Sequence, residues 1–276
     1  MDVANNSACM ATAPIGIFDS GVGGLSVWRE IVRQLPAEHT LYFADQAHIP
    51  YGQRPLDDVR RLTENVTRFL LAQGAKIIVV ACNTASGAAL HALRDTFPDT
   101  PFVGMEPAVK PAVEHTRTGA VGVIATPATF EGDLFAGLVA RFGDGVDLHA
   151  QACPGLVEVV EAGALDTPET EALLRRYLTP LRDAGIDQLV LGCTHYPFLS
   201  PAIQRIVGPE VTLIDPAPAV ARQVGRVLAE RNLRAPVSQY ANHQFYTSGD
   251  PRTFFKMARV LIGSMLDNIQ SINQYP

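Results

Sequence analysis

Residues 189–199 read LVLGCTHYPFL, an apolar run that leads into glycine, cysteine, a hydroxyl and an imidazole. A short apolar run with such an ending is typical of a buried strand that stops at a loop. Residues 77–86, IIVVACNTAS, have the same form, with small polar residues and an expected helix start after the cysteine. Because ligands of α/β proteins bind where strands end, we expect Cys82 and Cys193 at two such ends. We hypothesise that their thiols face each other across one substrate.

The order of the predicted elements indicates an α/β fold. Strand-like and helix-like segments alternate along almost the whole chain, which favours parallel sheets with helical crossovers. The two cysteine strands occupy similar positions in two halves of this pattern. We therefore expect two facing α/β domains with mainly parallel sheets, related by a pseudo-two-fold axis, with an active-site cleft between them. The first domain would comprise residues 1–106 and 216–276, and the second residues 107–215.

Proline-containing and polar stretches mark the expected boundaries. Residues 105–107 and 215–218 contain proline and are predicted to link the two domains. Residues 1–14 and 264–276 are predicted to form loose tails at the two ends of the chain.

A glycine-rich turn, DSGVGG at residues 19–24, follows a predicted strand at 15–18 and precedes a predicted helix. It lacks the Gly-Lys-Ser/Thr of a P-loop, and its glycine spacing is poor for a dinucleotide fingerprint. The carboxylate of Asp19 would repel a phosphate. Asp19 therefore suits an ammonium group or a proton-transfer role.

Composition narrows the classes of partner. The chain has 276 residues, of which 47% are hydrophobic, enough for a globular core. Its net charge is −6 and it has no long basic run, so we do not expect nucleic acid as a partner. The negative net charge does not exclude an anionic substrate, because the local electrostatic field of a cleft governs what binds there. The sequence shows neither a signal peptide nor a membrane span, which predicts a cytoplasmic protein with no membrane partner.

The four cysteines lie far apart and form no CxxC pair, which fits neither a disulfide scaffold nor a zinc ribbon. Reduced thiols in a cytosol are the natural interpretation. For Cys9, in the expected tail, and Cys153, before a Pro-Gly turn, we expect packing roles only. Cys82 and Cys193 each end an apolar strand just before an expected helix. A helix N-terminus lowers the pKa of a thiol, and the repeated context favours function for both.

Several chemistries use two thiols. A disulfide would be redox-sensing at most, and a zinc site using both cysteines and His195 lacks a convincing fourth ligand. We expect no metal. A cysteine hydrolase needs a histidine beside its thiol, and the two-residue separation of Cys193 from His195 makes that geometry awkward. The remaining chemistry is acid–base: one thiolate removes a proton from carbon and one thiol donates to the opposite face, which inverts a stereocentre without a cofactor.

Four motifs then carry a family resemblance: DSGVGGL at 19–25, PYG at 50–52, ACNTA at 81–85 and GCTHYP at 192–197. Together, and in this order, they resemble the motifs of glutamate racemase, within the aspartate/glutamate racemase superfamily. The resemblance runs from about residue 15 to 263. It implies a cofactor-independent enzyme that supplies D-glutamate for peptidoglycan, and it is compatible with a homodimer.

The resemblance also implies residue roles. Cys82 would act on the D-enantiomer with help from Asp19. Cys193 would act on the L-enantiomer with help from His195, and Glu161 would support the His195 side. The residues expected to hold the α-carboxylate and amino group are Asp19, Ser20, Asn83, Thr84, Thr194 and His195. Those expected to hold the side-chain carboxylate are the backbone of Tyr51 and Gly52, together with Thr126 and Thr129.

Alternatives remain open at this stage. An aspartate racemase of the same superfamily is the nearest, although His195 after Cys-Thr resembles the glutamate form. A related decarboxylase typically keeps one of the two cysteines, and this chain has both. A non-catalytic binding protein on the same fold would use Asp19, Ser20, Thr84 and Thr126 only as helix caps. In that interpretation Glu161 would lie on a solvated face.

Overall fold

A computed structural model of the chain describes residues 11–237 and 240–274. A six-stranded sheet has the order β10-β9-β2-β1-β3-β4. Every neighbouring pair in it is parallel. Its strands are β1 (Ile15–Asp19), β2 (Thr40–Ala44), β3 (Ile77–Val80), β4 (Phe102–Gly104), β9 (His243–Thr247) and β10 (Ile269–Gln274).

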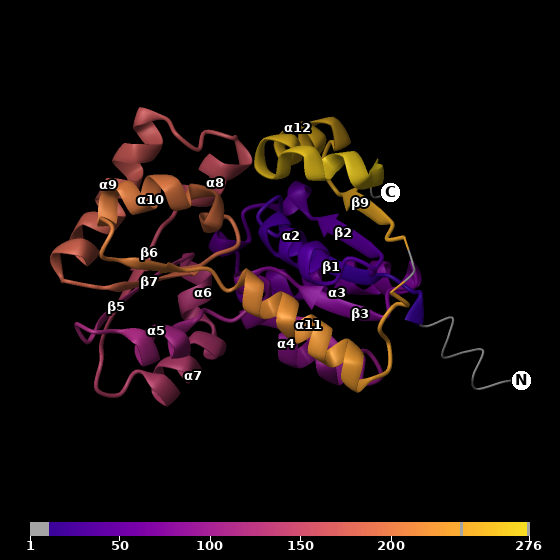
Figure 1. The fold of residues 1–276 in the computed structure, drawn as a ribbon, viewed down its shortest axis with the longest axis horizontal. Coiled ribbons are helices and arrows are strands. Elements are labelled where there is room, and N and C mark those ends of the chain that lie inside the picture. The colour runs from indigo at the N-terminus through magenta and orange to yellow at the C-terminus, as the bar shows by residue number, and fades with distance from the viewer. Residues whose placement is uncertain (1–10, 238–239, 275–276) are drawn as a thin grey trace, which may run out of the picture.

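A second sheet has four strands in the order β6-β5-β7-β8, and its pairs are also parallel. Its strands are β5 (Ala120–Ala125), β6 (Asp147–Ala152), β7 (Gln188–Gly192) and β8 (Thr212–Ile214). The two sheets lie side by side along the long axis of the molecule (Figure 1). Two parallel sheets with interleaved helices confirm the expected α/β class.

Helices cover both sheets. Around the six-stranded sheet lie α2 (Leu25–Gln34), α3 (Leu56–Ala72), α4 (Asn83–Thr96), α11 (Ala217–Glu230) and α12 (Pro251–Ile262). The four-stranded sheet carries α5 (Val109–His115), α6 (Pro127–Glu131), α7 (Asp133–Phe142), α8 (Leu156–Glu161), α9 (Pro168–Asp183) and α10 (Ser200–Val207). The short 3-10 turns are η1 (Gln46–His48), η2 (Tyr51–Gln53), η3 (Tyr196–Leu199) and η4 (Gly263–Asn268).

The central strands are apolar on both faces because helices cover both faces. In β1, Ile15 and Ile17 belong to the same hydrophobic core as Trp28 of α2, whereas Phe18 belongs to the core under α3 and α4. The first of these cores also continues into the second sheet, where it includes Leu191 of β7. A shared apolar core therefore holds the two sheets against each other.

The chain leaves the six-stranded sheet after β4 and returns to it through α11, so the C-terminal elements lie beside the N-terminal ones (Figure 1). We propose on this basis that residues 1–106 and 216–276 form one domain and residues 107–215 the other. Among the described residues, no helix combines the length and apolar character needed to cross a lipid bilayer.

The structure contradicts the expectation that residues 264–276 form a loose tail, and it contains two helices that were not expected. η4 and β10 occupy most of the expected C-terminal tail, and β10 pairs in parallel with β9. Its sequence, IQSINQ, is mostly polar, as an edge strand allows, and therefore gave little strand signal. Helices α7 and α10 were not predicted. Of the expected N-terminal tail, residues 1–10, including Cys9, lie outside the described residues.

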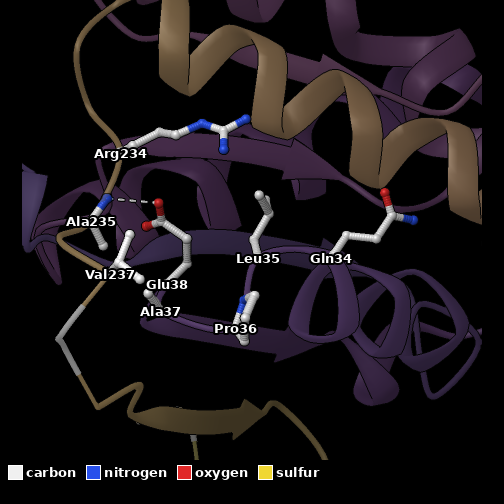
Figure 2. A pocket seen from close by; sticks show the side chains of 8 residues that line it. All are labelled: Gln34, Leu35, Pro36, Ala37, Glu38, Arg234, Ala235 and Val237. Carbon is white, nitrogen blue, oxygen red and sulfur yellow. Dashed lines mark hydrogen bonds between the residues drawn. The ribbon is translucent and has the colours of Figure 1, made fainter.

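A buried ion pair anchors the segment that follows α11. Lys76 Nζ lies 2.6 Å from Glu38 Oε2, and the Lys76 side chain is fully buried. The other oxygen of Glu38 accepts a hydrogen bond from the backbone N–H of Ala235, 2.8 Å away, as Figure 2 shows. Glu38 and Ala235 line a surface pocket of about 260 Å³, and none of the candidate site residues lines it. Glu38 thus ties the returning chain to the first sheet.

We expect Glu38→Ala to lower the free energy of unfolding by about 3–5 kcal/mol, because it leaves the Lys76 ammonium buried without a carboxylate partner. Urea titration followed by far-UV circular dichroism measures this. The control is Glu64→Ala, which breaks an exposed pair with Arg68 and should change the unfolding free energy by less than about 1 kcal/mol. Equal losses in both variants would contradict the assignment.

Candidate functional site

The carboxyl ends of the parallel strands bring most of the candidate residues together. Asp19 ends β1, and Cys82 follows the paired strand β3. On the other sheet, Thr126 follows β5 and Cys193 follows β7, which pair in register through Ala125 and Gly192. Parallel strands end at the same edge of a sheet, so each sheet presents one cysteine among polar side chains.

Cys82 lies at the start of α4, where its Sγ accepts a hydrogen bond from the backbone N–H of Ala85 at 3.5 Å. The hydroxyl oxygen of Ser20 is 4.0 Å from the same sulfur. Burial raises the pKa of the Cys82 thiol well above its usual value, and the charges of Asp19 and of a Cys193 thiolate raise it further. The two cysteines therefore interact electrostatically, and Cys82 is held as the neutral thiol.

Cys193, His195 and Glu161 form a continuous line. His195 Nδ1 lies 3.7 Å from Cys193 Sγ, and His195 Nε2 lies 2.8 Å from Glu161 Oε1. The expectation that a two-residue separation makes the cysteine–histidine contact awkward is therefore wrong. The backbone turns directly after β7, which folds the His195 ring back toward the thiol.

The contacts of His195 favour its imidazolium form. Burial by itself lowers the pKa of His195, but the hydrogen bonds and charges of Cys193 and Glu161 outweigh burial and raise it well above its usual value. For Glu161, burial raises the pKa, and the hydrogen bond and charge of His195 outweigh this and lower it. His195 is thus cationic and Glu161 anionic at neutral pH.

The helix expected directly after Cys193 is absent at that point. Two turn residues follow it, then the 3-10 turn η3 at Tyr196–Leu199, and α10 begins only at Ser200. Pro197 and Pro201 flank this start. The ring of His195, rather than a helix N-terminus, is therefore the group that lies against the Cys193 sulfur.

The glycine-rich turn allows this line to approach the first sheet. A Cβ at Gly21 would lie 2.0 Å from Glu161 Oε1, and a Cβ at Gly23 would lie 2.2 Å from His195 Nδ1. Between them, the backbone N–H of Val22 donates to Glu161 Oε1 at 2.7 Å. Only glycine leaves room for the imidazole and carboxylate at these two positions.

Asp19 is fully buried, and its carboxylate accepts hydrogen bonds from the backbone of the same turn. Its Oδ2 accepts from the N–H groups of Gly24 and Gly21, at 2.9 Å and 3.2 Å. Its Oδ1 accepts from the Thr194 hydroxyl, which belongs to the other sheet, at 3.3 Å. Burial raises the pKa of Asp19 above its usual value, although the charge of His195 opposes the rise.

Three hydroxyls form a triangle between the sheets. Thr84 Oγ1 lies 2.9 Å from Thr126 Oγ1 and 3.1 Å from Thr129 Oγ1, and the latter two are 2.9 Å apart. Gly52 packs against this triangle, since a Cβ there would lie 2.5 Å from Thr126 Cβ. The phenol of the neighbouring Tyr51 is occupied, because it donates to Asp45 Oδ2 at 2.6 Å.

The side-chain amide of Asn83 differs from these hydrogen-bonded groups. Its amide nitrogen and oxygen are both buried and have no hydrogen-bond partner within the described part of the chain. Buried polar groups without partners are rare and point to a missing ligand or a functional role. Asn83 is the first residue of α4, directly after Cys82 in the chain.

The structure thus gathers all the candidate residues into one buried region between the sheets. The sequence analysis missed two residues of this region. Asp45 follows β2 and accepts a hydrogen bond from the Tyr51 phenol. Gln46 donates from its side-chain amide to Glu161 at 3.0 Å. The position of Asp45 after a predicted strand could have signalled its role, whereas nothing in the sequence marks Gln46. Within the described residues, no group of three or more His, Cys, Asp or Glu side chains is arranged to hold a metal ion.

Comparison with known proteins places the chain in a family. The family model described as Asp/Glu/Hydantoin racemase matches residues 15–224. A glutamate racemase from Roseiflexus sp. is 54% identical over 242 residues, which cover 87% of this chain and 89% of the relative.

Solved structures are similar over nearly the whole chain. A glutamate racemase isoform from Bacillus anthracis has a TM-score of 0.86 at 34% identity, covering 96% of this chain and 97% of that one. The glutamate racemase of Francisella tularensis, solved in complex with D-glutamate, has a TM-score of 0.84 at 28% identity, covering 96% and 98%. The chain therefore belongs to the glutamate racemase family of the Asp/Glu racemases, and it is an amino-acid racemase.

Proposed function

We propose that the protein interconverts L- and D-glutamate without a cofactor, using Cys82 and Cys193 as the paired acid and base. The observation that carries this proposal is one buried thiol at a strand end of each sheet, with Asp19 of the first sheet hydrogen-bonded to Thr194, the residue after Cys193, on the second. An amino acid between them would meet one sulfur on each side of its α-carbon. Inversion at carbon needs two proton carriers in that arrangement.

The chemical step balances with these groups alone. The Cys193 thiolate removes the α-proton of L-glutamate, and the C–H electron pair passes to the α-carbon and its carboxylate. The Cys82 thiol then donates its proton to the opposite face, which yields D-glutamate, a Cys193 thiol and a Cys82 thiolate. The raised pKa of Cys82 suits the donor in this direction, and the reverse reaction exchanges the two roles.

His195 and Glu161 would activate the Cys193 side. An imidazolium 3.7 Å from the sulfur stabilises the thiolate. Glu161, 2.8 Å from the other ring nitrogen, keeps the imidazole charged and oriented. Asp19 would serve the Cys82 side and accept the substrate ammonium.

Recognition of the carboxylates would rest on neutral donors and the His195 imidazolium, because the candidate set contains no Lys or Arg. Asn83, Thr84 and Thr194, with Ser20 and His195, are proposed to bind the α-carboxylate and amino group. Thr126, Thr129 and the backbone of Tyr51 and Gly52 are proposed to bind the side-chain carboxylate. Preorganised donors in a buried site stabilise developing negative charge more strongly than water does.

The biological role we propose follows from family membership. D-glutamate made by this chain would enter peptidoglycan synthesis, as the family resemblance implies. We further propose that the protein works in the cytoplasm, where the free thiols of Cys82, Cys153 and Cys193 stay reduced.

We expect the purified protein, without added cofactor, to abolish the circular dichroism signal of L-glutamate over time and to leave L-aspartate largely unchanged. Cys82→Ser and Cys193→Ser should each reduce two-way racemisation by about 10³-fold or more, because a serine hydroxyl is a far weaker acid than a thiol. Cys153→Ser is the matched control and should keep activity. Full activity in either of the first two variants would overturn the mechanism.

Glu161→Gln should narrow the pH range of activity from the alkaline side. Glu161 raises the pKa of His195, so its removal lets the imidazolium deprotonate at a lower pH. The alkaline limb of the kcat/KM profile should therefore move to lower pH, and kcat/KM near neutrality should fall by about tenfold or more. A pH titration of racemisation measures both, and an unmoved alkaline limb would contradict the assigned role.

Asn83→Ala should separate binding from stability. Because the buried Asn83 amide has no partner in the described residues, its removal should leave the thermal midpoint unchanged or slightly higher. The KM for glutamate should rise by about tenfold, the effect expected for loss of a hydrogen bond to a charged group. Thermal unfolding and initial rates measure the two effects, and a lower midpoint with unchanged KM would refute the prediction.

A further inference from the structure

Glu161 receives support from a residue outside the line already described. Its Oε1 accepts from His195 and from the N–H of Val22, whereas its Oε2 accepts from the Gln46 amide nitrogen at 3.0 Å. Gln46 belongs to η1 beside the six-stranded sheet, and Glu161 ends α8 beside the four-stranded sheet. The contact therefore joins the two halves of the molecule at the carboxylate.

The groups on its two sides, the Glu161 carboxylate and the Thr247 hydroxyl, fix the orientation of the Gln46 amide. The hydroxyl oxygen of Thr247 accepts from the N–H of Gly249 at 3.0 Å, and its own proton goes to Gln46 Oε1 at 3.1 Å. An ionised carboxylate only accepts hydrogen bonds, so the NH₂ must face Glu161 and the amide oxygen faces the Thr247 hydroxyl. The hydrogen bonds thus run from Thr247 through Gln46 to Glu161.

The backbone around Gln46 is also held in place. The N–H of Ala47 donates to the Ser248 hydroxyl at 3.0 Å, and that hydroxyl donates to Asp45 Oδ1 at 2.7 Å. A Cβ at Gly249 would lie 3.0 Å from Gln46 Cβ, so this glycine leaves room for the side chain. The loop after β2 is therefore tied to the end of β9, and Gln46 projects from a fixed base.

We propose that Gln46 is a positioning residue of the racemase: it holds the Glu161 carboxylate in the orientation that serves His195 and, through it, the thiol of Cys193. This inference rests on the proposed function and adds a residue to its Cys193 side. Donation to Oε2 leaves Oε1 turned toward the imidazole. It also favours the ionised carboxylate, in agreement with the lowered pKa of Glu161.

The same loop offers a matched control. Gln53 Nε2 donates to Glu158 Oε1 at 3.1 Å, again from the first sheet to α8, but this contact is exposed. Among the described residues, no side-chain hydrogen bond joins Glu158 to a candidate site residue. If Gln46 only fastened the loop to α8, substitutions of Gln46 and Gln53 would have similar effects. A role in orienting Glu161 makes only Gln46 matter.

The experiment compares full-length wild type with Gln46→Leu, Gln46→Glu, Thr247→Val and Gln53→Leu. For each, kcat and KM are measured in both directions, thermal midpoints check folding, and mass spectrometry follows iodoacetamide alkylation of Cys193 and Cys82 at neutral pH. Because the two enantiomers have equal free energies, kcat/KM must change by the same factor in both directions. The alkylation rates are therefore what assigns an effect to one thiol.

We expect Gln46→Leu to lower kcat by about tenfold with little change in KM, the usual effect of losing a hydrogen bond to a charged group. Gln46→Glu keeps the side-chain volume but opposes a carboxylate to Glu161, so it should be worse. Thr247→Val should give a smaller loss of the same kind. Alkylation of Cys193 should slow while that of Cys82 holds, and Gln53→Leu should stay within about twofold of wild type.

Three results would overturn the inference: Gln46→Leu within about twofold of wild type, Gln46→Glu as active as wild type, or equal slowing of alkylation at both thiols. A wild-type protein that fails to racemise glutamate would instead refute the proposed function. The alkylation comparison would still decide the role of Gln46, because it needs no turnover.

Discussion

The contact of the glycine turn with the His195–Glu161 pair is the constraint on which the rest of the site depends. Two ionised side chains from one sheet enter space that Cβ atoms at Gly21 and Gly23 would fill on the other. Because these groups are buried, they must find partners, and the partners come from across the junction. The backbone N–H of Val22 and the amide of Gln46 meet this need. The turn therefore couples the pairing of the two sheets to the ionisation of the line that reaches Cys193.

The sequence predicts most of the architecture because the apolar runs are strong local signals. Strands β1, β3 and β7 lie at the apolar runs that predicted them, which precede the glycine-rich turn, Cys82 and Cys193. The motifs also located the candidate residues, since strand ends in parallel sheets converge. Weak signals account for the misses: β10 is mostly polar, and α7 and α10 each follow another helical turn almost directly.

Contacts between distant segments could not be read from the sequence. The bond between Gln46 and Glu161 spans 115 positions, and no local pattern specifies it. The approach of His195 to Cys193 depends on how the backbone turns after β7, and residue spacing alone suggested the opposite. The ionisation of the site follows from burial together with these contacts, so it too becomes visible only in three dimensions.

The position of β9 has a consequence for the order in which the protein matures. β9 pairs with β2 and places Phe245 against Trp28, with ring centroids 5.1 Å apart, yet it is made after the whole four-stranded unit. On the ribosome, β2 is therefore an open edge, and Trp28 of α2 lacks its contact with Phe245, until β9 emerges. The N-terminal half, which begins synthesis first, completes its fold last. A nascent chain cut short before residue 243 would expose this edge to aggregation.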